Sequence, residues 1–316
     1  MIDFNRILCP IDFSEYSDHA LKYAMKMASW YGASLHVLHV MPPVPPATVS
    51  PLAEAGRQLT ARNLVAAVAR WQEPDVPVTT DLLESADPSA RILEQAEALD
   101  VDLIVTGSHG RKGVQRLLLG SVVEPLLHKS LRPVLVLPAG LNLTRLEKPI
   151  GFDRIVCAVD FASASLAALA HAFSIAEESD AQLTLLNVLE MPPELANPPQ
   201  PPDFDVTPIR AEAEADRLAR LQALVPEHAR DYCTVETAVL EGGVSRQVLR
   251  VAEQQNADLI VLGVHGRNAL DLTVFGSNSK DVITRAHCPV LIVPAASRRH
   301  SFARTGGTVR SRAVRS

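Results

Sequence analysis

Residues 4–43 read FNRILCPIDFSEYSDHALKYAMKMASWYGASLHVLHVMPP, and residues 152–193 repeat this pattern as FDRIVCAVDFASASLAALAHAFSIAEESDAQLTLLNVLEMPP. At an offset of 148 residues, Asp12 falls on Asp160 and Val40 on Val188. The match resumes at DLIVTGSHGR and DLIVLGVHGR with an offset of 156, so the second copy is longer in a proline-rich segment typical of surface loops. The chain is therefore a tandem repeat of two homologous halves. We place the first domain at residues 1–143 and the second at residues 151–296.

Each half alternates short apolar runs with helical patterns. In the first half, runs rich in Val, Ile and Leu predict strands at 6–11, 34–40, 78–83, 102–107 and 133–138. These runs do not alternate with polar residues, which indicates strands buried on both faces. Residues 17–32 and 88–100 have helical spacing. The order predicts an α/β fold in which each half is a doubly wound, five-stranded parallel sheet, with ligands at the carboxyl ends of the strands.

A glycine motif occurs at the same place in both halves. Residues 106–121 read TGSHGRKGVQRLLLGS and residues 262–277 read LGVHGRNALDLTVFGS, which share the pattern Gly-x2-Gly-x9-Gly-Ser. Gly107 lies at the carboxyl end of a predicted strand, so we expect it to allow positive φ and the close approach of a ligand. The two glycines can form an anion nest, and Gly120-Ser121 precedes a predicted helix whose N-terminus favours phosphate.

The same glycines also suit ordinary turns and helix caps. The motif is neither a Walker A loop nor a Gly-x-Gly-x-x-Gly dinucleotide fingerprint.

Composition and charge narrow the class of protein. No run of eighteen apolar residues occurs, and the N-terminus does not resemble a signal peptide, so we expect a cytoplasmic protein without a membrane span. Residues 297–316 carry six Arg and no acid and are predicted to be a basic disordered tail. The remaining body is acidic, which argues against a nucleic-acid partner. The cysteines form no C-x-x-C pair; Cys9 and Cys157 are predicted core residues, and we expect no disulfides.

The runs ILCPIDFS, LHV, DLIVTGSHGR, GS and PVLVLP together resemble the universal stress protein family, over the whole chain except the tail. The resemblance implies a HUP-like fold that binds ATP or another adenine nucleotide and dimerises through its last strand. In a tandem chain the two last strands, 133–138 and 289–294, are expected to pair with each other. A further homodimer and the protein partner stay open.

The resemblance also assigns cofactor-binding positions, with adenosine at the end of the first strand and phosphates at the glycine motif. In the first half these positions are Pro10, Asp12, Val40, Gly107, Ser108, His109, Gly110, Arg111, Lys112, Gly113, Gly120, Ser121 and Val122. In the second half they are Ala158, Asp160, Val188, Gly263, Val264, His265, Gly266, Arg267, Asn268, Ala269, Gly276, Ser277 and Asn278. Ala158 and Asn278 replace the proline and the small apolar residue of the family pattern. The second half keeps a family glycine, Gly242, where the first half reads ESADPS.

Several of these residues have a structural alternative. Asp12 and Asp160 each end an apolar strand and either bind the nucleoside or cap the following helix. His109 and His265 order the glycine loop or pack at the seam between the halves, and neither has an adjacent carboxylate that would make it a general base. His36 and His39 lie three apart on a strand and point to opposite faces, which argues against zinc. Mg²⁺ would accompany the phosphates of bound ATP.

We therefore expect a nucleotide-dependent regulator of the stress response that hydrolyses ATP slowly at most. An interaction scaffold without nucleotide is one alternative, and the intact glycines in both halves count against it. An ATP-using enzyme of the same fold group is another. PIDFSE and AVDFAS lack the Ser-Gly-Gly or HIGH-type loops of such enzymes.

Overall fold

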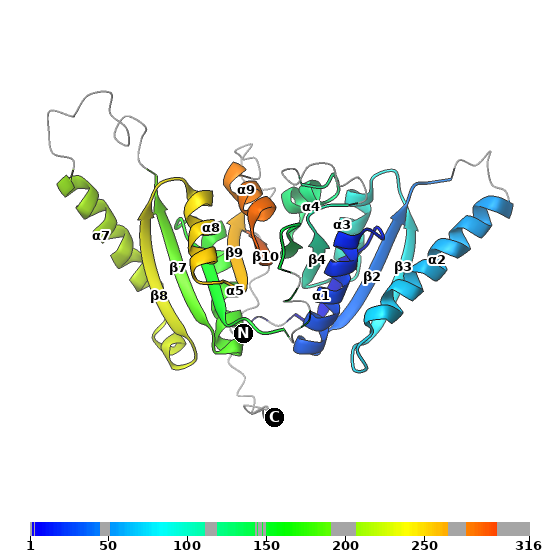
Figure 1. Ribbon diagram of the computed structural model, residues 1–316, viewed down its shortest axis with the longest axis horizontal. Coiled ribbons are helices and arrows are strands. Elements are labelled where there is room, and N and C mark those ends of the chain that lie inside the picture. Colours follow the sequence, from blue (N-terminus) through cyan, green and yellow to red (C-terminus); the bar gives the residue numbers. More distant parts are fainter. Residues whose placement is uncertain are drawn as a thin grey trace, which may run out of the picture.

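One continuous sheet of ten strands runs through the molecule (Figure 1). The computed structural model describes residues 2, 4–44, 51–110, 119–142, 144, 147, 150–190, 207–264 and 276–295. The strand order is β3-β2-β1-β4-β5-β10-β9-β6-β7-β8. The first five strands belong to the first half of the chain and the other five to the second, so the halves stand side by side.

The first half has the predicted strands. They are β1 (Arg6–Pro10), β2 (Ser34–Met41), β3 (Val78–Glu84), β4 (Leu103–Gly107) and β5 (Val134–Leu137). Its helices are α1 (Glu15–Tyr31), α2 (Pro51–Trp71), α3 (Pro88–Ala98) and α4 (Val123–Lys129). Helix α2 was not predicted from the sequence. The reason is that α2 offers a weak apolar pattern, since Leu64 and Val68 are its buried residues.

The second half repeats this order. Its strands are β6 (Arg154–Ala158), β7 (Gln182–Leu189), β8 (Thr234–Glu241), β9 (Leu259–Val264) and β10 (Val290–Pro294). Its helices are α5 (Ser163–Ser179), α7 (Thr207–Ala223), the 3₁₀-helix η3 (Glu227–Asp231), α8 (Val244–Gln254) and α9 (Ser277–Arg285).

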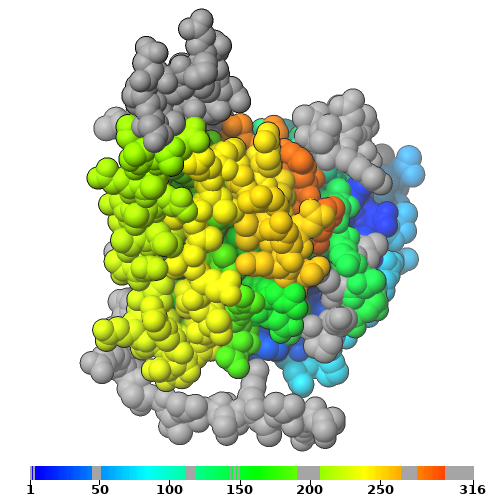
Figure 2. Space-filling model, turned by 60° about the vertical axis from the view of Figure 1, so that its left-hand side comes forward, coloured from blue at the N-terminus to red at the C-terminus, as the bar shows by residue number. Residues whose placement is uncertain are grey.

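Helices cover both faces of the sheet, as a doubly wound fold requires. One apolar core lies under α1 and α5, and a second lies under α3, α4, α8 and α9; both cores extend through the two halves. The space-filling view shows α8 and α9 next to each other on the surface of the second half (Figure 2). Within each half all strand pairs are parallel, which confirms the predicted α/β class.

The halves meet through their last strands, as predicted. β5 and β10 pair in antiparallel fashion, with Leu135 opposite Leu291 at the centre of the register. This ladder makes two five-stranded sheets into one and leaves neither of these two strands as a sheet edge.

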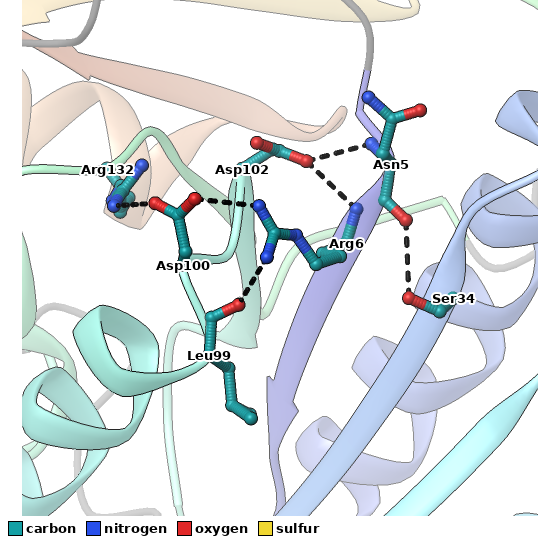
Figure 3. Close-up of polar contacts among 7 residues, drawn as sticks. All are labelled: Asn5, Arg6, Ser34, Leu99, Asp100, Asp102 and Arg132. Carbon is teal, nitrogen blue, oxygen red and sulfur yellow. Dashed lines mark hydrogen bonds and ion pairs between the residues drawn. The ribbon is translucent and has the colours of Figure 1, made fainter.

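In the first half, a cluster of polar contacts lies at the end of the sheet opposite the predicted site (Figure 3). Asp100 accepts from Arg6 at 2.8 Å and from Arg132 at 2.7 Å, while Asp102 accepts from the backbone N–H of Arg6 at 2.9 Å. The cluster ties the amino end of β1 to the starts of β4 and β5. The repeat places Cys288 at the position of Arg132, so this ion pair is specific to the first half.

Other predictions concern the cysteines and the membrane. All four cysteines are buried thiols, as expected for Cys9 and Cys157. Burial raises the pKa of Cys9 and raises that of Cys157 to about 12, so both stay protonated.

Among the described residues, no helix has the length and apolar content needed to cross a membrane. The basic tail and most of the proline-rich segments lie outside the described residues.

Candidate functional site

The predicted positions of the first half converge at the carboxyl ends of three strands. Pro10 ends β1, Val40 lies near the end of β2, and Gly107 ends β4. β1 lies between β2 and β4 in the sheet, so these ends are neighbours. The order of the sheet changes direction at β1, and such a switch point is where doubly wound folds bind ligands.

Asp12 connects the end of β1 to the glycine loop. Its Oδ1 accepts hydrogen bonds from the backbone N–H of Ser14 at 3.0 Å and from the Ser14 hydroxyl at 2.5 Å. Ser14 in turn caps α1, because its Oγ accepts from the N–H of Ser17 at 3.2 Å. The second oxygen, Oδ2, would lie 2.6 Å from a Cβ added at Gly110. One carboxylate thus supports the helix start and also borders the loop that was predicted to hold phosphates.

The third glycine of the motif packs against the same loop. The N–H of Gly120 donates to the carbonyl of Ser108 at 2.9 Å. A Cβ at Gly120 would lie 3.4 Å from that carbonyl and 3.7 Å from the backbone nitrogen of Gly110. The loop after β4 and the segment before α4 are therefore in direct contact, as the spacing of the motif suggested.

None of the motif glycines that the structure describes has a positive φ. The expectation that Gly107 allows positive φ was therefore wrong. Among the described residues of the candidate sites, those with left-handed backbone are Phe13 (φ 62°) and Phe161 (φ 67°), in the turns that follow β1 and β6. Gly107 is needed for a different reason: a Cβ there would lie 2.8 Å from the carbonyl oxygen of Tyr16. At Gly263 a Cβ would overlap the carbonyl group of Ala164. The first glycine of each motif thus lets the first turn of α1 or α5 pack on the end of β4 or β9.

His109 orders the loop. Its Nδ1 lies 2.8 Å from the Ser108 hydroxyl, and its ring packs on Tyr16 with centroids 5.4 Å apart. The side chain is buried, and its Nε2 has no hydrogen-bond partner among the residues that the structure describes. A buried imidazole nitrogen without a partner is costly unless a ligand supplies one.

The second half builds a similar turn with different residues. Asp160 accepts from the Ser165 hydroxyl at 2.5 Å and from the N–H of Ala162 at 2.9 Å. Ala162, at the place of Ser14, cannot cap α5 with a side chain. Gly276 caps α9, and its carbonyl accepts from the N–H of Lys280 at 3.1 Å, which matches the 3.1 Å bond from Glu124 to Gly120 in the first half.

One residue near the site was not predicted. His39 is buried, and its Nδ1 lies 2.7 Å from the carbonyl of Ile11, which can only accept, so Nδ1 carries the proton. The repeat places Asn187 at this position, and its Nδ2 donates to the carbonyl of Val159 at 2.6 Å. His39 and Asn187 share the ability to donate. Comparing the two halves for shared donors would have found them.

The loop that contains Gly242 differs between the halves for a simple reason. Between β8 and the cap Gly243 there is a single residue, Gly242, with φ 126°, a conformation that favours glycine. The first half uses Ser85 and Ala86 between β3 and the cap Asp87. The added residue removes the need for left-handed backbone, and therefore the need for glycine.

Other predicted positions also have a place. Val122 and Val40 pack on the core under α3 and α4, as do Ala158 and Val188 on their side. Ser121 is exposed, and Val264 is buried. Eight positions lie outside the described residues: Arg111, Lys112, Gly113, His265, Gly266, Arg267, Asn268 and Ala269.

The described residues contain no group of three or more His, Cys, Asp or Glu side chains that could hold a metal. His36 and His39 have separate partners: His36 lies 3.2 Å from Asp81 and 2.7 Å from the Thr79 hydroxyl.

Comparison with known proteins places this geometry in a family. The model of the universal stress protein family matches residues 3–138 and again residues 151–294. The chain therefore belongs to the universal stress protein family, in its tandem two-domain form.

Relatives match at two lengths. A universal stress protein of Mycolicibacterium smegmatis is 29% identical over 301 residues, which cover 91% of this chain and 96% of the relative. A universal stress protein of Methanocaldococcus jannaschii is 31% identical over 142 residues, 45% of this chain and 82% of its own. The crystal structure of a universal stress protein from Archaeoglobus fulgidus has the same fold, with a TM-score of 0.67 and 23% identity over 92% of this chain and 98% of that one.

Proposed function

We propose that this universal stress protein binds ATP, or another adenine nucleotide, in the cytoplasm and acts as a nucleotide-dependent regulator of the stress response. The observation that carries the proposal is the meeting of three parts at the carboxyl ends of β1 and β4. Asp12 borders Gly110, and Gly120 packs on the carbonyl of Ser108, so the turn after β1, the loop after β4 and the segment before α4 meet at one place.

The residues fit the group they would hold. Pro10, Asp12 and Val40 would line the adenosine, and the loop after β4 with Gly120 and Ser121 would receive the phosphates. Backbone N–H groups and an exposed hydroxyl suit phosphate oxygens, and the Nε2 of buried His109 supplies one further polar group in this loop. In the second half Asp160, Gly276 and Ser277 would act in the same way. Mg²⁺ bound with ATP would neutralise part of its charge.

Two features support binding over rapid catalysis. Nδ1 of His109 is occupied by Ser108, and Oδ1 of Asp12 is occupied by Ser14. The Ser108 hydroxyl beside His109 is fully buried and Asp12 Oδ1 is bonded to Ser14, so neither contact offers a substrate a nucleophile and its base. ATP hydrolysis, if it occurs, would depend on positioned phosphates and a metal and would be slow.

The scaffold without nucleotide remains the second candidate because of one observation. Gly107 and Gly263 are required by packing against Tyr16 and Ala164, so their presence in the sequence does not by itself require a ligand. Gly110 and Gly120 border the loop, so substitutions at these two glycines distinguish a nucleotide-binding protein from a scaffold without nucleotide.

Nucleotide retention tests the proposal. The chain is purified without added ligand and denatured, the released nucleotides are identified, and ATP binding with Mg²⁺ is measured by calorimetry. We expect close to two adenine nucleotides per chain, with Gly120→Glu and Gly276→Glu each removing one site. Gly120→Ala is the matched control, because its Cβ makes ordinary contacts of 3.4 Å or more. Absence of both retained nucleotide and calorimetric binding would refute the proposal and favour the scaffold.

A further inference from the structure

The seam between the halves lies on an approximate twofold axis. The repeat offset of 156 makes Leu291 the equivalent of Leu135, and these two residues face each other in the β5–β10 ladder. Val134 and Val136 face Ile292 and Val290 in the same reciprocal way. A residue that meets its own equivalent lies at the axis of an isologous contact.

The strands of this seam do not distinguish one half from the other. β5 reads VLVL and β10 begins VLIV, so two copies of β5 would pair as well as β5 with β10. All the side chains in the ladder are buried and apolar. Burial of this kind is non-directional and would stabilise a contact between two like halves to a similar degree.

A second pair at the axis does distinguish the halves. Glu124 and Lys280 are equivalent by the same offset, and Lys280 Nζ lies 2.9 Å from Glu124 Oε1. Both side chains are partly buried, with 40% and 33% of their surface exposed. Where two like halves met, Glu124 would face a second Glu124, or Lys280 a second Lys280. Each such contact replaces attraction by repulsion.

The opposite face of the sheet has an independent asymmetry. The backbone N–H of Ile2 donates to the hydroxyl of Ser174, on α5, at 2.6 Å. With the offset of 148, the first half has Lys26 at the position of Ser174. A lysine ammonium only donates hydrogen bonds. Two first halves paired along this seam would therefore leave the N–H of Ile2 facing a donor rather than an acceptor.

We propose that Glu124 and Lys280, supported by the Ile2–Ser174 contact, make the seam selective for the opposite half of the chain. The partner that this surface fits is a half with the complementary charge at the axis, and like halves are disfavoured. The selectivity comes from side chains around an apolar ladder that would otherwise accept either half. The inference concerns pairing and does not depend on nucleotide binding.

Charge reversal in the full chain tests this. Glu124→Lys places two lysines at the axis, and Lys280→Glu places two glutamates there. A chain of either variant cannot relieve the repulsion by exchanging halves with its own copies. A mixture of the two variants can do so in an exchanged dimer. There the first half of the E124K chain meets the second half of the K280E chain with the charges reversed, and the other two halves restore the native contact of Glu124 with Lys280.

Each variant alone, the 1:1 mixture, the wild type and the double variant E124K/K280E are denatured, refolded and compared by size exclusion with light scattering. We expect the mixture to contain about tenfold more two-chain species than either variant alone, and the double variant to match the wild type. A mixture that matches the average of the separate variants would overturn the proposal. The test holds even if a single variant folds poorly alone, because exchange restores the complementary contact. Repeating it at high salt should reduce the excess of the mixture.

Discussion

Replacing Gly107 by alanine should destabilise the fold even when no nucleotide is present. The added Cβ would lie 2.8 Å from the carbonyl oxygen of Tyr16 and 3.1 Å from its Cβ. The first turn of α1 would have to move by about 0.6 Å to reach the 3.4 Å of an ordinary contact. Overpacking of this kind costs about 1–3 kcal/mol. The lower entropy of the unfolded alanine chain offsets about 0.4–1 kcal/mol of this, so we expect a net loss of about 1–2 kcal/mol.

Urea denaturation followed by far-UV circular dichroism, on ligand-free protein, measures this loss. Gly263→Ala should be more severe, because its Cβ would overlap the backbone of Ala164. Gly56→Ala is the matched control: Gly56 lies in exposed α2 with nothing within 4 Å, so alanine should stabilise by about 0.5–1 kcal/mol. If Gly107→Ala shows the same gain as Gly56→Ala, the packing explanation of the first motif glycine is refuted.

Two further predictions follow from the histidines of β2. His39→Asn should keep most of the stability, since Asn187 makes the same bond in the second half, whereas His39→Leu leaves the carbonyl of Ile11 without its donor and should cost about 1–3 kcal/mol in urea denaturation. Equal losses for the two variants would contradict this. Burial lowers the pKa of His36 below its ordinary value of 6.5, against the opposing effect of Asp81. Neutral His36 therefore contributes fully to the free energy of unfolding above pH 6.5. This contribution is lost as the pH falls through the lowered pKa, because the unfolded chain binds the proton at a higher pH than the folded chain does. His36→Gln should flatten this part of the pH–stability profile, and an unchanged profile would show that another group titrates.

The positions of the candidate site residues could be predicted from the sequence because the same residue types recur at the same places in both halves. The repeat located both glycine motifs and both aspartates, and parallel strands placed them at the same edge of the sheet. What each residue does was less accessible. Asp12 supports the start of α1, because its Oδ1 accepts a hydrogen bond from the capping residue Ser14, whereas its binding of the nucleoside stays a prediction. The role of Gly107 as a contact point for α1 could not be read from the motif, since it depends on how closely a helix approaches a strand.

By itself, the sequence determined the tandem repeat, the α/β class and the strands of the first half. These follow from local hydrophobic patterns and from their recurrence along the chain, which require no knowledge of distances. The pairing of the last strands was predicted from the family resemblance and is confirmed by the β5–β10 ladder. Only the tertiary structure showed which backbone atoms exclude a Cβ at Gly107 and Gly263 and that Phe13 has a left-handed backbone. It also showed that Glu124 and Lys280 form an ion pair. These features arise between segments far apart in the chain. Their energies depend on separations of a few tenths of an ångström, which sequence spacing does not encode.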